Sequence, residues 1–158
     1  LSLFKIKPKM HLFPSTFISK IILYSGIIFY FGLFYSKENT TKKGIDFYNG
    51  NYEEALQKAK TEEKLVFVYL YADWCGVCKS LKKNTLKDKK VGQFYNDEYV
   101  SLALNAEKGE GKKIAESIGL RSYPTLLFLD GGNGRILNRV SGYKSPIQLI
   151  NLGKVYTE

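Results

Sequence analysis

Hydrophobic positions follow two patterns along this chain, and each pattern predicts one kind of element. Apolar residues spaced three or four apart are typical of amphipathic helices, and continuous runs of β-branched and aromatic residues are typical of buried strands. The predicted helices are 52–60, 75–86, its continuation after a break over 92–96, 112–118 and a last segment from Pro146 onward. The predicted strands are 64–71, 99–105, 125–129 and 135–141. This order, α-β-α-β-α-β-β-α, predicts an α/β domain with a mixed sheet flanked by helices.

The end of the chain carries more specific signals. A glycine-rich turn over 130–134 tolerates positive φ angles, so the strands on either side of it are predicted to form a hairpin. Pro146 suits the first position of the last helix. The side chains predicted to face inward from that helix are Ile147, Leu149 and Ile150.

The N-terminal part of the chain is predicted to be a membrane segment. Residues 21–35 carry no charge, and the apolar stretch over 17–35 would span about 28 Å as a helix, close to the ~30 Å hydrocarbon core of a bilayer. We therefore divide the chain into a basic flank (1–16), a transmembrane or signal-anchor helix (17–35), a polar linker (36–43) and a domain (44–158). A cleaved signal peptide is the alternative interpretation.

Lysines flank the apolar stretch unevenly, and their distribution predicts an orientation. Four precede the uncharged run 21–35 and three follow it, so the positive-inside rule favours a cytoplasmic N-terminus. The domain would then face an extracytoplasmic, periplasmic compartment, either anchored or exported after signal cleavage.

The net charge of +9 is concentrated at the N-terminus. Residues 1–43 hold seven lysines and one glutamate, whereas residues 44–158 hold 17 basic and 14 acidic residues. The domain has only three arginines, at positions 121, 135 and 139, and shows no basic stripe interleaved with aromatic residues. We therefore predict no nucleic-acid partner.

The composition excludes several kinds of site. One histidine and two cysteines are too few for most dedicated zinc centres, so we predict no metal. The chain has neither a dinucleotide-binding glycine motif nor a Walker A motif, and we predict no cofactor.

The two cysteines, Cys75 and Cys78, directly follow a predicted strand and begin a predicted helix. The free N–H groups and the dipole at a helix N-terminus stabilise an anion, so Cys75 is predicted to be the attacking thiolate. Cys78, one turn further along, is placed to attack a mixed disulfide and release the product. Cys-x-x-Cys after a strand is the pattern of a redox site.

Three other interpretations of the cysteine pair remain open at this point. A zinc half-site would need partners that the sequence does not supply. A purely structural disulfide would close a short loop and remove little entropy from the unfolded chain. Two inert buried thiols are the third interpretation.

Tyr123-Pro124-Thr125 stands directly before a predicted strand. Proline cannot donate to a strand ladder, and an X-Pro bond can be cis. This tripeptide follows the Cys-x-x-Cys pair by about 45 residues and precedes the predicted hairpin, and the three features together are more specific than any one of them.

Residues 72–79, with Tyr123-Pro124-Thr125 and the turn before Gly142, resemble the thioredoxin superfamily. The likeness runs over 51–152 and is strongest to membrane-linked bacterial members such as the C-terminal domain of the disulfide-interchange protein DsbD. The resemblance implies a thioredoxin fold, Cys75 as nucleophile, Cys78 as resolving cysteine and Pro124 as a cis-proline beside them. It further implies that the backbone at Tyr123 pairs with an extended substrate segment, with Trp74 beside the groove.

Three positions depart from the family pattern. The buried acid expected five residues before Trp74 is replaced by Tyr69, and an acid expected four residues after Cys78 is replaced by Lys82. The residues between the cysteines are Gly-Val rather than Gly-Pro. Asp73 is a candidate for proton transfer in place of the missing acid, and an exposed acid without that role is the alternative.

These inferences predict a membrane-anchored thiol:disulfide oxidoreductase that acts on the dithiols and disulfides of exported proteins. We favour a reductase or isomerase supplied by an unidentified electron donor. The alternatives are an oxidase that donates its disulfide and a non-catalytic thioredoxin-fold binding or assembly module.

Overall fold

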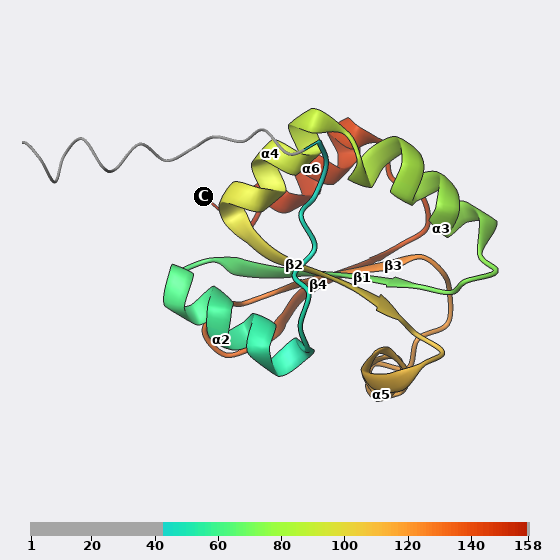
Figure 1. Ribbon diagram of the computed structural model, residues 1–158, viewed down its shortest axis with the longest axis horizontal. Coiled ribbons are helices and arrows are strands. Elements are labelled where there is room, and N and C mark those ends of the chain that lie inside the picture. Colours follow the sequence, from blue (N-terminus) through green and yellow to red (C-terminus); the bar gives the residue numbers. More distant parts are fainter. Residues whose placement is uncertain (1–42, 158) are drawn as a thin grey trace, which may run out of the picture. The chain divides into compact units, whose positions relative to one another are not determined.

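A four-stranded mixed sheet forms the centre of the domain in the computed structural model, which describes residues 43–157 (Figure 1). The strands are β1 (Leu65–Tyr71), β2 (Tyr99–Asn105), β3 (Thr125–Leu129) and β4 (Ile136–Ser141), in the order β2-β1-β3-β4. β1 runs parallel to β2 and antiparallel to β3, and β4 is antiparallel to β3. The two central strands are almost entirely buried, which agrees with their continuous apolar sequences.

Helices cover both faces of this sheet (Figure 1). The helical elements are α2 (Tyr52–Glu62), α3 (Gly76–Leu81), the π-helix η1 (Lys82–Leu86), α4 (Lys89–Glu98), α5 (Gly109–Ser117) and α6 (Pro146–Lys154). α3, α4 and α6 lie on one face with the core around Phe67 and Tyr95, and α2 and α5 lie on the other with the core around Val66 and Leu102. The predicted α/β fold with a helix-flanked mixed sheet is confirmed.

Local signals in the sequence explain where several helices begin. Asn51 and Ser145 each close a capping box with the residue three positions later, at the starts of α2 and α6. Pro146 takes the first position of α6, as predicted. The Asp88 carboxylate accepts from the backbone N–H groups of Lys90 and Val91, so α4 has its own N-cap.

Three predicted helices differ from the structure. The segment 92–96 is part of the longer helix α4, and the end of the helix after the cysteines is a π-helix. α5 starts at Gly109, three residues before the predicted start. The prediction missed this first turn because its glycines and charged residues show no apolar period.

The prediction that Ile147 faces inward is wrong, since 64% of this residue is exposed. Leu149 is fully buried. Residues two positions apart in sequence point about 200° apart around a helix, so Ile147 and Leu149 occupy opposite faces of α6. Ile150 is half-buried against the core, as predicted.

The described chain begins against η1 and α4 before it reaches the sheet. The Ile45 N–H donates to the Leu86 carbonyl at 2.8 Å, and Phe47 forms a parallel bridge to Ser101 of β2. The basic flank, the predicted transmembrane helix and all of the predicted linker except Lys43 lie outside the described residues. Over 43–157, we find no helix with the length and apolar character needed to cross a bilayer.

Candidate functional site

Cys75 and Cys78 lie where the chain leaves β1 and enters α3. Cys75 is the N-cap of α3, with φ −70° and ψ 106°, and its Sγ accepts the backbone N–H of Cys78 at 3.0 Å. The two sulfurs form a disulfide with an S–S distance of 2.14 Å. Only 4% of Cys75 is exposed, and Cys78 is more deeply buried. The first sulfur is therefore held at the start of the helix by a backbone donor.

Tyr69 lies beneath this pair, on β1. Its buried hydroxyl donates to the Cys78 carbonyl at 2.9 Å, and its ring stacks on Tyr71 at a centroid distance of 5.3 Å. Burial, with a smaller contribution from Tyr71, raises the pKa of Tyr69 to about 12. The position at which the family pattern has an acid therefore carries a neutral hydrogen-bond donor.

Asp73 precedes Trp74 on the exposed side of the site. Its carboxylate accepts a hydrogen bond from Lys108 Nζ at 2.6 Å, and chiefly this bond holds the pKa of Asp73 below its ordinary value. The carboxylate and the ammonium are both well exposed. Asp73 is thus kept in its anionic form by Lys108, and its role in proton transfer stays a prediction.

Trp74 projects from the site with 67% of its surface exposed. Its indole N–H donates to the Glu107 carboxylate at 2.9 Å, and its ring meets Tyr123 edge to face with centroids 5.6 Å apart. Trp74 and Tyr123, predicted from distant parts of the sequence, therefore lie in contact.

Pro124 is buried, and the peptide bond between Tyr123 and Pro124 is cis, as the resemblance implied. Its carbonyl accepts the N–H of Gly142 at 2.8 Å, and the Thr125 hydroxyl bonds to that of Ser141. The proline segment is thereby tied to the end of β4.

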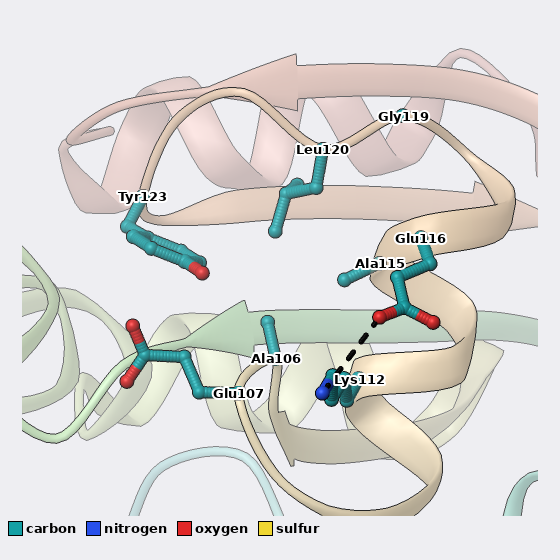
Figure 2. Close-up of a pocket in the computed structure, with 8 residues that line it drawn as sticks. All are labelled: Ala106, Glu107, Lys112, Ala115, Glu116, Gly119, Leu120 and Tyr123. Atoms are coloured by element: carbon teal, nitrogen blue, oxygen red, sulfur yellow. Dashed lines mark ion pairs between the residues drawn. The ribbon is translucent and has the colours of Figure 1, made fainter.

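A hollow of about 460 Å³ lies beside Tyr123, between α5 and the segment that leads into β3 (Figure 2). Ala106, Ala115, Leu120 and the Tyr123 ring supply apolar surface. Figure 2 shows charged groups from α5 and from the loop after β2 around it, including the Lys112–Glu116 ion pair, whose charged atoms are 3.9 Å apart. They are Glu107, Lys112 and Glu116.

Sequence reasoning missed Glu107 and Lys108, which hold Trp74 and Asp73. β1 and β2 are parallel and Tyr71 pairs with Asn105, so the loops that follow the two strands meet at the same edge of the sheet. The sequence does show that each loop directly follows a predicted strand. It does not show that the two strands are paired in this register, and without that pairing the contacts of Glu107 and Lys108 could not be predicted.

The described residues contain no group of three or more histidine, cysteine or acidic side chains that could hold a metal ion. The chemistry that they do offer at this site is that of a sulfur pair. The disulfide at this place can take two electrons and two protons from a donor, and the dithiol so formed can pass them to another disulfide.

A sequence family described as a thioredoxin-like domain matches residues 52–155. The chain belongs to the thioredoxin-like family. The matched stretch contains both cysteines, Trp74 and the cis-proline segment, so the predicted resemblance is confirmed.

Two similar proteins of this family carry names that refer to disulfide chemistry. The thiol:disulfide interchange protein DsbD of Tatumella citrea is 32% identical over 105 residues, which is 65% of this chain and 18% of DsbD. The solution structure of a candidate disulphide-isomerase from Bacteroides thetaiotaomicron is 39% identical, with a TM-score of 0.63, and the match covers 73% of this chain and 97% of that one.

FAS-associated factor 2-A of Xenopus laevis is also similar, at 30% identity over 107 residues, which is 66% of this chain and 24% of that protein. The chain thus spans less than a quarter of the length of either curated relative. Family membership and the bonded Cys75–Cys78 pair make this thioredoxin-like domain a thiol-disulfide oxidoreductase.

Proposed function

We propose that the protein is a membrane-anchored thiol:disulfide oxidoreductase that exchanges disulfides with exported proteins from an extracytoplasmic, periplasmic position. The observation that carries the redox part is the Cys78 N–H bond to Cys75 Sγ at the start of α3. The same N–H would stabilise a Cys75 thiolate after reduction, because a helix N-terminus favours an anion. The apolar sequence over 17–35 supports the anchor.

The reaction proceeds in two exchanges. The Cys75 thiolate attacks one sulfur of the substrate disulfide, forms a mixed disulfide and releases the other substrate sulfur as a thiolate, which takes up a proton. Cys78 then loses its proton and attacks Cys75 Sγ, which forms the Cys75–Cys78 disulfide and releases the second substrate thiol. The substrate gains two electrons, and a dithiol donor returns two electrons to the cysteine pair.

Trp74, Tyr123 and Pro124 would bind the substrate. The contact between Trp74 and Tyr123 supports a common surface, and the hollow beside Tyr123 offers apolar area for a substrate side chain. An extended substrate segment would pair with the backbone at Tyr123 by strand addition.

Two features bear on proton transfer at Cys78. Asp73 is the nearest candidate in sequence, but Lys108 stabilises its anionic form. Tyr69 contacts the Cys78 carbonyl and would position the cysteine rather than accept its proton.

The favoured direction is reduction or isomerisation. The names of the Tatumella and Bacteroides relatives, which refer to disulfide interchange and to isomerisation, support it. An oxidase that donates its disulfide is the alternative within the same chemistry.

A non-catalytic binding or assembly module is the second candidate function. The similarity to a protein named as an associated factor favours it. Peptide binding that survives loss of both cysteines would support this candidate, whereas binding that depends on Cys75 would support the redox function.

Single-cysteine variants of the full chain test the redox proposal. Cys75→Ser should abolish reduction of a disulfide-bonded protein such as insulin, because the attacking sulfur is gone. Cys78→Ser should accumulate a mixed disulfide, since attack remains and resolution is lost. Wild-type activity in Cys75→Ser would overturn the proposal.

A further inference from the structure

The exposed side of α3, η1 and the start of α4 carries a dense group of lysines, which we call the lysine face. Its members are Lys79, Lys82, Lys83, Lys87, Lys89 and Lys90. All six residues are exposed, and over the described residues none of them takes part in an ion pair. The one acid among them, Asp88, is occupied as the N-cap of α4.

The lysine face accounts for the whole net charge of the described domain. Residues 43–157 hold 18 basic and 13 acidic side chains, a surplus of five. Residues 79–90 hold six lysines and one aspartate, which is again a surplus of five. The rest of the domain is therefore electrically balanced, and the surplus positive charge comes from one segment of three successive helical elements.

The described chain begins beside η1 and α4, two of the elements that carry these lysines (Figure 1). The Gly44 carbonyl accepts from the Asn96 amide at 3.2 Å, and Ile45 bonds to Leu86 at the end of η1. Only the eight residues of the linker 36–43 separate this point from the apolar stretch over 17–35, a reach of about 28 Å at full extension. A bilayer that holds the apolar stretch is thus within reach of the lysine face.

The side-chain chemistry favours lipid over protein as the partner. All basic residues of the face are lysines, with no arginine among them. Lysine is depleted at protein–protein interfaces, where arginine is enriched. The lysine ammonium is a point charge on a flexible side chain. It is therefore better suited to the mobile phosphates of a lipid surface than to a fixed bidentate contact with a protein carboxylate.

We propose that the lysine face lies against an anionic lipid surface, an inference that depends on the proposed membrane anchor. Lys79 follows Cys78 directly, so this contact would hold the cysteine pair at the edge of the membrane-facing surface. The active site would then lie within reach of a donor in the bilayer, while Trp74 remains open to exported substrates.

Lysine acylation in nanodiscs tests the inference on the full chain. The chain is reconstituted in phosphatidylcholine alone or in phosphatidylcholine mixed with phosphatidylglycerol, and the acylation rate of each lysine is read by mass spectrometry. Anionic discs should slow acylation of the lysine face by at least about threefold relative to neutral discs. Lys60 and Lys113, exposed on helices of the opposite face, should react equally in both.

Charge reversal provides the matched variants. Lys83→Glu with Lys90→Glu should abolish the protection of the remaining lysines in anionic discs, and Lys60→Glu with Lys113→Glu, which changes the net charge equally, should leave it intact. Insulin reduction by the same samples reports the redox function separately, and retention in neutral discs reports the anchor.

Equal acylation in neutral and anionic discs would overturn the inference, as would a chain that stays with neither kind of disc. Protection by an acidic polypeptide such as polyglutamate, without protection by anionic lipid, would assign the face to an acidic protein segment and would also overturn it. In each of these cases unchanged insulin reduction would leave the proposed redox function standing.

Discussion

Tyr69 links the sheet to the cysteine pair through one buried hydrogen bond. Its hydroxyl donates to the Cys78 carbonyl, which also accepts the N–H of Lys82 within the helix. A carboxylate at this position could exchange a proton with a thiol, but a phenol with a pKa of about 12 stays protonated at neutral pH. Tyr69 is therefore a positioning residue for the first turn of α3.

Replacing Tyr69 with phenylalanine should lower the free energy of unfolding by about 1 kcal/mol at neutral pH, the usual worth of one buried hydrogen bond. The Cys78 carbonyl keeps its helical partner, so a larger loss is not expected. Urea unfolding followed by circular dichroism measures the change. Tyr71→Phe on the same strand is the matched control, because the Tyr71 hydroxyl forms no hydrogen bond within residues 43–157.

The same variant changes the response to alkaline pH. Because the folded pKa of Tyr69 lies above its ordinary value of 10.0, the stability that it contributes is complete below pH 10 and is lost as pH rises through about 12. In Tyr69→Phe, the free energy of unfolding should fall less steeply as pH rises from 10 to about 12, by the slope that one bound proton contributes. An unchanged slope in Tyr69→Phe would contradict the assignment.

α4 is held to the first described residues by a contact between two glycines. A Cβ at Gly92 would lie 2.2 Å from the Gly44 carbonyl oxygen, and one at Gly44, where φ is +91°, would lie 2.6 Å from the Leu86 carbonyl oxygen. No side chain fits between these backbones. The two glycines thereby seat the start of the domain against η1 and α4.

Gly92→Ala should lower the free energy of unfolding by about 2 kcal/mol or more, because the clash is with backbone that has no rotamer to change. Gly76→Ala is the control, since a Cβ there meets nothing within 4 Å and alanine favours a helix. Equal stability of the two variants in urea would show that α4 and the entering segment separate freely.

Periodicity predicted the elements with strong apolar patterns and failed where the pattern was weak. The runs of apolar, aromatic and β-branched residues in β1 and β2 predicted strands that the structure contains. The prediction for α4 started too late because the first turn of this helix begins with two lysines and contains a glycine. The prediction for Ile147 was wrong because an apolar residue at a helix end does not reveal which face it occupies. The π-helix η1 has no periodic signature that the sequence could show.

At the scale of the whole molecule, the site combines parts that differ in how far the sequence reveals them. Cys75, Cys78 and Pro124 follow from motifs, because their spacing is itself the signal. Glu107 and Lys108 do not, because their position depends on the pairing of β1 with β2 and on side-chain directions. Tyr69 was visible only as a departure from the family, and its hydroxyl contact required coordinates.

The reduction potential of the Cys75–Cys78 couple tests the central claim most directly. The full chain is equilibrated against glutathione buffers, and the disulfide fraction is read by thiol labelling. If the protein is a reductase, we expect a single two-electron transition at about −270 mV, a value typical of thioredoxin. A transition near about −120 mV would contradict the favoured direction and indicate a disulfide donor, and the absence of any transition would contradict the redox function itself.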